Sequence, residues 1–165
     1  MTLRKTLGIA AGAMLTAGLL ATAPAQAYQQ KISNDLGRCS AGSGPAVKVT
    51  VRGVKASRGT IRVQTYRGTS SEWLKKGKWL HRVEAPAQRG TMTFCLPVPA
   101  AGTYAVAVRH DLNGNGDTDL REDGGGMSND PSINIFNLGK PSYTKTAFPV
   151  GDDVKSITIN MKYWG

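Results

Sequence analysis

The chain has 165 residues, of which 21 are Lys or Arg and 11 are Asp or Glu, giving a formal net charge of +10. This length suits one domain, and 40% hydrophobic with 19% charged residues is typical of a globular protein rather than a disordered one. The two cysteines are too few for a zinc finger, an iron–sulfur site or a disulfide-rich miniprotein. The excess of positive charge raises the question of a nucleic-acid partner, which the motifs below address.

Residues 1–27 have the organisation of a secretory signal peptide. Arg4 and Lys5 precede an uncharged apolar stretch over residues 7–23, and residues 25–27 (AQA) form a small-residue cleavage site. The alternative is a membrane anchor, but the apolar stretch is short, rich in Gly and Ala, and ended by a proline. We expect cleavage after Ala27 and export to the periplasm or the extracellular space, with no transmembrane span in the mature chain.

Export gives the cysteine pair a structural interpretation. Cys39 and Cys95 would lie in an oxidising compartment, where disulfides form and persist. Nothing in the chain resembles the Cys-x-x-Cys motif of redox catalysts. We therefore expect a disulfide between Cys39 and Cys95.

Alternation of apolar and polar residues predicts β-strands along the chain. The apolar positions are Val47, Val49 and Val51; Ile61, Val63 and Thr65; Met92, Phe94 and Leu96; Tyr104, Val106 and Val108; and Ile157, Ile159, Met161 and Tyr163. Only residues 71–80 have the pattern of a short helix. The sequence predicts an all-β fold, an antiparallel β-sandwich of about seven strands with Greek-key or prealbumin-like connections. We expect it to span residues 46–165, after an N-terminal extension over residues 28–45 that carries Cys39.

Residues 111–141 form a long segment without clear strands, and its first part matches a calcium-binding loop. The pattern D-x-[DN]-x-[DN]-G-x5-E fits residues 111–122, because oxygen ligands at positions 1, 3, 5, 7, 9 and 12 converge on one ion. The predicted Ca²⁺ ligands are Asp111, Asn113, Asn115, Asp117, Asp119 and Glu122. A strand before the loop and three glycines after it exclude an EF-hand fold. The alternative is a turn whose Asn and Asp side chains cap their own backbone.

Several segments together resemble a known family. They are VKVTVRGVKASRGTIRVQTY, PVPAAGTYAVAVRHDLNGNGDTD, GGGMSND and SITINMKY. These segments are similar to the family called domain of unknown function 2141, small exported bacterial proteins, over roughly residues 46–163. The resemblance implies a β-sandwich and an exported protein but no activity, and Met127 replaces an expected aromatic residue. More distantly, the connector resembles carboxypeptidase-regulatory and transthyretin-like sandwiches, in which Tyr104 would pack and hydrogen-bond at a sandwich corner.

Basic residues are dispersed along the predicted strands, where alternation places many of them on a solvated outer face. The strongest local cluster for an anionic surface combines aromatic and basic side chains in Trp73, Lys75, Lys76, Lys78 and Trp79. The alternative for the two tryptophans is a place in the hydrophobic core. The expected partner is an anionic envelope polymer or an envelope protein. Export and the lack of a recognition motif argue against nucleic acid.

The sequence offers little for catalysis. His110 adjoins Asp111 at a predicted strand end, but no nucleophile–base motif such as G-x-S-x-G or H-E-x-x-H accompanies it. We expect no catalytic residues and interpret the protein as a non-catalytic binding or structural module of the cell envelope. The alternatives are a metal-assisted, hydrolase-like enzyme using His110 and loop carboxylates, and an adhesion or assembly module.

Overall fold

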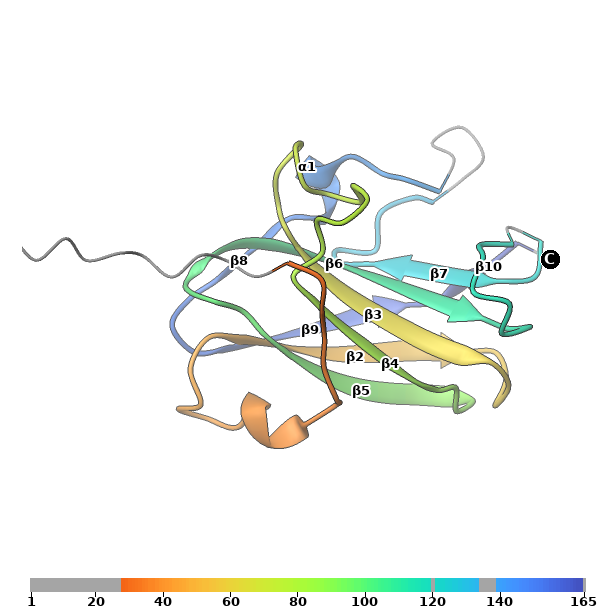
Figure 1. Ribbon diagram of the computed structural model, residues 1–165, viewed down its shortest axis with the longest axis horizontal. Coiled ribbons are helices and arrows are strands. Elements are labelled where there is room, and N and C mark those ends of the chain that lie inside the picture. The colour runs from red at the N-terminus through yellow and green to blue at the C-terminus, as the bar shows by residue number, and fades with distance from the viewer. Residues whose placement is uncertain (1–27, 120, 134–138, 165) are drawn as a thin grey trace, which may run out of the picture.

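Two β-sheets packed face to face form the part of the chain that the computed structural model describes, residues 28–119, 121–133 and 139–164 (Figure 1). The expected signal peptide, residues 1–27, lies outside the described residues. The larger sheet contains, in spatial order, β1 (Gln30–Lys31), β4 (His81–Pro86), β3 (Thr60–Arg67), β6 (Gly102–Asp111), β7 (Gly124–Met127) and β10 (Lys162–Tyr163), while β8 (Phe148–Val150) also pairs with β6. The smaller sheet contains β5 (Gly90–Pro97), β2 (Ala46–Val54) and β9 (Val154–Asn160).

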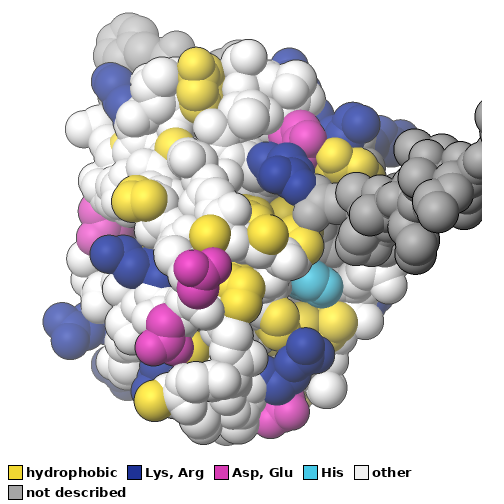
Figure 2. All heavy atoms as spheres, turned by 90° about the vertical axis from the view of Figure 1, so that its left-hand side faces the viewer, with side chains coloured by type: hydrophobic (Ala, Val, Ile, Leu, Met, Phe, Trp, Pro, Cys, Tyr) yellow, Lys and Arg dark blue, Asp and Glu magenta, His cyan; other side chains and the backbone are white. Residues whose placement is uncertain are grey.

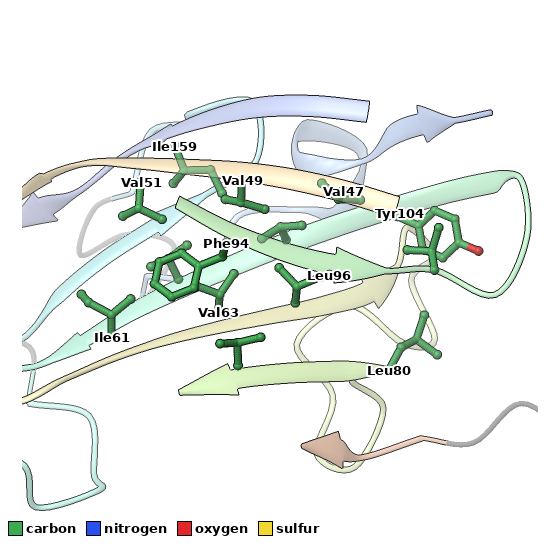
Figure 3. Close-up of a cluster of buried hydrophobic side chains, with 14 of the residues drawn as sticks. Val47, Val49, Val51, Ile61, Val63, Leu80, Phe94, Leu96, Tyr104 and Ile159 are labelled. Carbon is green, nitrogen blue, oxygen red and sulfur yellow. The ribbon is translucent and has the colours of Figure 1, made fainter. Parts of the chain in front are cut away.

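The core lies between the two sheets and consists of the inward positions of the alternating runs (Figure 3). Side chains of successive strand residues point to opposite faces, so every second residue enters the core. The fully buried set includes Val47, Val49 and Val51 of β2, Ile61 and Val63 of β3, Phe94 and Leu96 of β5, and Ile159 of β9. The predicted all-β sandwich is therefore confirmed.

The order of strands within each sheet differs from their order along the chain. β2 pairs with β5 and β3 pairs with β6, both antiparallel, so the chain passes from the smaller sheet to the larger one after β2 and again after β5. Two pairs are parallel, β2 with β9 and β1 with β4. β9 enters the smaller sheet from β8 of the larger one and not by a hairpin from β2, which allows the parallel orientation.

Some local structure differs from the sequence prediction. Residues 71–80 form turns in place of the expected short helix, because Leu74 and Gly77 adopt positive φ angles of 53° and 75°. β4, β7 and β8 were not expected, and β7 lies inside the segment predicted to lack strands. The final predicted run divides into β9 and β10, which belong to different sheets. The helices among the described residues are short, a 3₁₀ turn η1 (Leu36–Cys39) and α1 (Tyr143–Thr146).

The predicted disulfide is confirmed. Cys39 and Cys95 are bonded, with an S–S distance of 2.05 Å and a Cα–Cα distance of 5.8 Å. Asn34 reinforces the attachment, since its amide donates to the carbonyl oxygen of Thr93 at 2.9 Å and accepts from the N–H of Cys95 at 3.0 Å. The segment before residue 46 is thus fastened along β5.

Tyr104 occupies the corner position that the distant resemblance implies. Its ring is buried, and its hydroxyl donates to the carbonyl oxygen of Ala100 at 2.8 Å. This bond ties β6 to the connector that precedes it. In the described part of the chain, none of the helices has both the length and the apolar character needed to cross a bilayer.

Candidate functional site

The outer face of the larger sheet carries the polar positions of strands β3 and β6. Arg62 of β3 lies directly opposite Arg109 of β6, which is paired in turn with Gly125 of β7. The next pair of residues on this outer face is Gln64 of β3 and Ala107 of β6. Ala107 has a short side chain and Gly125 has none, so the sheet has a depression between the longer side chains that surround these two residues.

A pocket of about 250 Å³ lies over this low surface. Trp164 is 40% exposed, and a Cβ built on Gly125 would lie 3.4 Å from its ring, so the indole lies close above the glycine backbone. We call this site the basic pocket and define it by its polar residues Arg62, Gln64, Arg109 and Lys140 and its apolar wall of Leu74, Met127, Ile133 and Trp164. Its residues come from segments far apart in the sequence.

The two arginines of the pocket keep hydrogen-bond donors without partners. The Nε of Arg62 donates to Glu84 at 2.6 Å, while its two Nη groups have no hydrogen bond among the described residues. The Nε of Arg109 is buried and also has no partner in this part of the chain. The side chains of Arg62 and Arg109 are only 23% and 15% exposed. Unpaired donors of partly buried cations favour the binding of an anion.

Positive charge exceeds negative charge on this side of the sheet. Glu84 lies 2.6 Å from Arg62 and 3.6 Å from both Arg82 and Lys31, so one carboxylate faces three cations. Burial would raise the pKa of Glu84, but the hydrogen bond and the charge of Arg62 outweigh burial and lower it. Burial lowers the pKa of Arg82, and the charge of Arg62 lowers it further. The guanidinium groups of Arg62 and Arg82 therefore repel one another and share the Glu84 carboxylate as a counter-ion.

Arg109 connects the basic pocket to the predicted calcium loop. Its Nη1 donates to the Thr118 hydroxyl at 2.9 Å, and its Nη2 donates to the Gly116 carbonyl oxygen at 2.8 Å. Nη2 also lies 3.3 Å from Oδ2 of Asp111. The carboxylate of Asp111 accepts from the backbone N–H groups of Gly114 at 2.8 Å and Gly116 at 2.9 Å. The first predicted calcium ligand is thus nearly buried and paired with a cation.

Four of the other predicted calcium ligands lie together. Asn113 donates through Nδ2 to Asp119 at 3.0 Å and to Glu122 at 3.3 Å, and Asn115 donates to Asp119 at 2.7 Å. The hydrogen bonds from Asn113 and Asn115 lower the pKa of Asp119. Asp117 is exposed and contributes its backbone N–H, which donates to Asn115 at 2.8 Å.

The loop also shows the self-capped turns of the alternative interpretation. The Oδ1 atoms of Asn113 and Asn115 each accept from the N–H two residues further along the chain. Within the described residues, no group of three or more His, Cys, Asp or Glu side chains is arranged to hold a metal ion. A cation at this loop would therefore also need amide or backbone oxygens.

Asp123 has a structural role that the sequence analysis did not assign. Its side chain is buried and accepts from the backbone N–H groups of Leu112 and Asp119, each at 3.0 Å. Both ends of the loop are thereby held by one carboxylate. Asp123 stands directly before the three glycines that begin β7. This position is the sequence signal that could have indicated its role in holding the loop.

The cluster predicted to bind an anionic surface divides into two groups. Trp73 and Trp79 are buried; the Nε1 of Trp73 donates to the Pro141 carbonyl oxygen at 2.9 Å, and Arg82 lies 4.1 Å from the centre of the Trp79 ring. Lys78 lies over the ring of Tyr28 at 4.9 Å. The other two members, Lys75 and Lys76, are exposed and line a second pocket. Trp73 lines this second pocket as well, so three of the five members of the cluster lie around it.

His110, the residue of the enzyme alternative, lies on the opposite face of β6 from the basic pocket. Its side chain is fully buried, and both ring nitrogens have partners, the Tyr163 hydroxyl and the Arg58 carbonyl oxygen, each at 2.7 Å. Asp111, the next residue of β6, instead pairs its carboxylate with Arg109. The structure thus does not bring His110 together with the loop carboxylates.

The net charge of the chain does not by itself locate the site. On the face shown in Figure 2, Lys and Arg side chains are spread over the surface, and Asp and Glu side chains lie among them. The basic pocket differs because two of its cations, Arg62 and Arg109, are partly buried, opposite one another in register and next to apolar side chains. The alternating pattern placed the basic strand residues on a solvated face and singled out none of Arg62, Arg109, Lys140 and Trp164 for this site.

The fold and the site define a class of protein, an all-β sandwich with a basic pocket on one outer sheet face. Residues 49–158 match the family model described as "Uncharacterized protein conserved in bacteria (DUF2141)", and the chain belongs to this family. The resemblance noted in the sequence is thereby confirmed. Comparison with curated proteins and with solved structures found no match.

Proposed function

We propose that this protein is an exported, non-catalytic module of the bacterial cell envelope that binds an anionic ligand in the basic pocket. The observation that supports this most is the pair of partly buried arginines, Arg62 and Arg109, which lie opposite one another in register beside an apolar wall. A pocket of mostly apolar lining with a few convergent polar groups is the usual form of a small-ligand site. The ligand would place a carboxylate or phosphate at the arginines and an apolar part against Trp164.

Binding fits the pocket better than catalysis does. The polar groups of the pocket are mainly donors, which hold an anion but do not abstract a proton. Asp123 also lines it, yet both of its oxygens accept backbone N–H groups of the loop. His110 faces the core and not the pocket. The Cys39–Cys95 disulfide supports export, because such bonds are stable in oxidising compartments.

The test uses 8-anilinonaphthalene-1-sulfonate, an organic anion with an apolar body that fluoresces in apolar surroundings. We expect the folded protein to bind it, with weaker binding as salt is added. Arg62→Gln removes one guanidinium of the basic pocket and Ala107→Phe fills the pocket floor, so each should weaken binding at least tenfold. Lys48→Gln, an exposed change on the smaller sheet, is the charge-matched control. Equal binding by all four proteins, or none by the wild type, would refute the proposal.

A second proposal is that the loop of residues 111–122 binds Ca²⁺. It is supported by the convergence of Asn113, Asn115, Asp119 and Glu122, whose positions 3, 5, 9 and 12 the pattern requires to meet. The amide nitrogens now directed at Asp119 and Glu122 would have to rotate away, because they would repel a cation. Asp111 would have to accept the ion beside the Arg109 guanidinium. The residues thus fit a weak site, of the millimolar affinity found in extracellular modules.

Calorimetric titration with CaCl₂ and melting curves with and without the ion test this second proposal. We expect heat of binding and a rise in Tm at millimolar Ca²⁺, and the loss of both in Asp119→Asn. Asp152→Asn, which removes an exposed acid from another turn, is the control. An unchanged Tm and no heat at these concentrations would leave the self-capped turn as the whole role of the loop.

A further inference from the structure

A second pocket adjoins the basic pocket. It has a volume of about 540 Å³ and shares Leu74 and Lys140 with the basic pocket. Its other lining residues include Lys75, Lys76 and Tyr143. The two hollows are therefore neighbours along one side of the molecule, with a leucine and a lysine between them.

The walls of the second pocket are held together by the protein itself. The segment after β3 and the segment leading into α1 lie side by side above the larger sheet (Figure 1). The hydrogen bond from Trp73 Nε1 to the Pro141 carbonyl oxygen, at 2.9 Å, joins the two segments. Trp73 also packs edge-on against Tyr66 at 5.4 Å between ring centres. The pocket is thus built on a buried aromatic base and does not depend on a ligand to form.

We infer that the two pockets form one groove that binds a linear, carboxylate-bearing oligosaccharide. This inference rests on the proposed function, since it extends the ligand of the basic pocket across Lys140 to Lys75 and Lys76. Cations occur at one end of the groove, at its middle and at the other end, which matches a chain with repeated charges. A ligand with a single anionic group would use only one of these positions.

Other anionic chains fit this groove less well. A fatty acid carries one charged group, so most of the lysines would have no counterpart. Polyphosphate carries repeated charge but has no apolar face for Leu74, Tyr143 and Trp164. Sugar rings of an acidic glycan have apolar C–H faces, hydroxyl groups and a carboxylate on each unit. Gln64, Ser70 and Ser142 line the groove as partners for the hydroxyls.

Chain-length dependence of binding tests the inference. The probes are mono-, di-, tetra- and hexamers of galacturonate and of mannuronate, titrated by calorimetry into the disulfide-bonded mature protein. We expect affinity to rise at least tenfold from monomer to tetramer for one of the two series, because contacts in the second pocket add to those in the first. Neutral maltohexaose, polyphosphate and a single-stranded DNA hexamer are the comparison ligands, and each should bind at least tenfold more weakly.

Two double variants assign the effect to the groove. Lys75→Ala with Lys76→Ala should remove most of the gain with chain length and leave monomer affinity within twofold. Lys48→Ala with Lys155→Ala removes two exposed lysines from the smaller sheet and should leave both unchanged. Equal affinity for monomer and hexamer would overturn the groove while the proposed function stands. If the protein still binds the anilinonaphthalene dye but no uronate, the ligand is not an acidic oligosaccharide. Equal binding of polyphosphate or DNA would likewise overturn the assignment of a glycan ligand. No binding of dye or uronate would overturn both.

Discussion

The imidazole Nδ1 of His110 lies 2.7 Å from the phenolic oxygen of Tyr163, and its Nε2 lies 2.7 Å from the carbonyl oxygen of Arg58. A carbonyl oxygen only accepts, so Nε2 carries the ring hydrogen and Nδ1 accepts from the Tyr163 hydroxyl. The same hydroxyl oxygen accepts from the backbone N–H of Lys55 at 3.0 Å. A fully buried imidazole therefore joins the turn before β3 to strand β10.

Replacing Tyr163 with Phe should destabilise the fold by about 1–3 kcal/mol, the usual effect of leaving buried hydrogen-bonding groups unpaired. The change removes the donor to His110 and the acceptor for the Lys55 N–H while keeping the ring. Urea unfolding measures the difference. Tyr143→Phe is the control, because its hydroxyl has no hydrogen bond among the described residues. Equal stability of the two variants would contradict the role given to this bond.

The sequence predicted the strands whose pattern comes from burial on one face. Val47, Val49 and Val51 alternate with polar residues, and they lie in the core as expected. β7 has the sequence GGGM, in which apolar and polar residues do not alternate. It forms a strand because it pairs with β6, and its own residues give no sign of this. Gly124 and Gly126 leave room there for Tyr163 and Ile159, whose side chains a Cβ would meet. Such complementarity between distant residues has no local signal.

Removing the Cys39–Cys95 bond should lower the free energy of unfolding by about 4 kcal/mol, because the bond closes a loop with a sequence separation of 56. The double variant Cys39→Ala, Cys95→Ala leaves no unpaired thiol, and chemical denaturation compares it with the oxidised wild type. Wild-type protein unfolded under reducing conditions should match the double variant. A variant as stable as the oxidised protein would show that the bond does not constrain the unfolded chain.

The candidate site was only partly predictable. The loop pattern predicts that Asn113, Asn115, Asp119 and Glu122 lie close together, and they do, because residues at fixed spacing in one turn are close whatever the fold; that they bind Ca²⁺ stays a prediction. The basic pocket depends instead on the register that sets Arg62 opposite Arg109 and on a chain end that brings Trp164 over Gly125. Register between strands that are not neighbours in sequence depends on the whole sheet.

Stability should fall as the pH falls below about 6.5, in part because of His81. Burial lowers the pKa of His81 below its ordinary value of 6.5, and the charge of Arg38 adds to this. The unfolded chain therefore binds a proton at higher pH than the folded one, so stability decreases from that pH down to the folded-state pKa. His81→Gln should flatten this part of the curve. Urea unfolding of the wild type and the variant from pH 8 to pH 5 gives the dependence of each free energy of unfolding on pH. The same dependence in both proteins would contradict the role given to His81.

Alanine substitutions at Gly59 and Gly114 distinguish the cost of steric overlap from the cost of a left-handed backbone conformation. Both have positive φ, +75° and +73°, but a Cβ on Gly59 would overlap the backbone carbonyl oxygen of Asp111, while one on Gly114 would meet nothing within 4 Å. Gly114→Ala should cost about 1–2 kcal/mol, the penalty for a left-handed non-glycine residue. Gly59→Ala adds a backbone clash at the β3–β6 pair, so we expect about 3 kcal/mol or more. Urea denaturation of both variants measures the difference, and equal losses would show that the backbone around Asp111 moves aside without penalty.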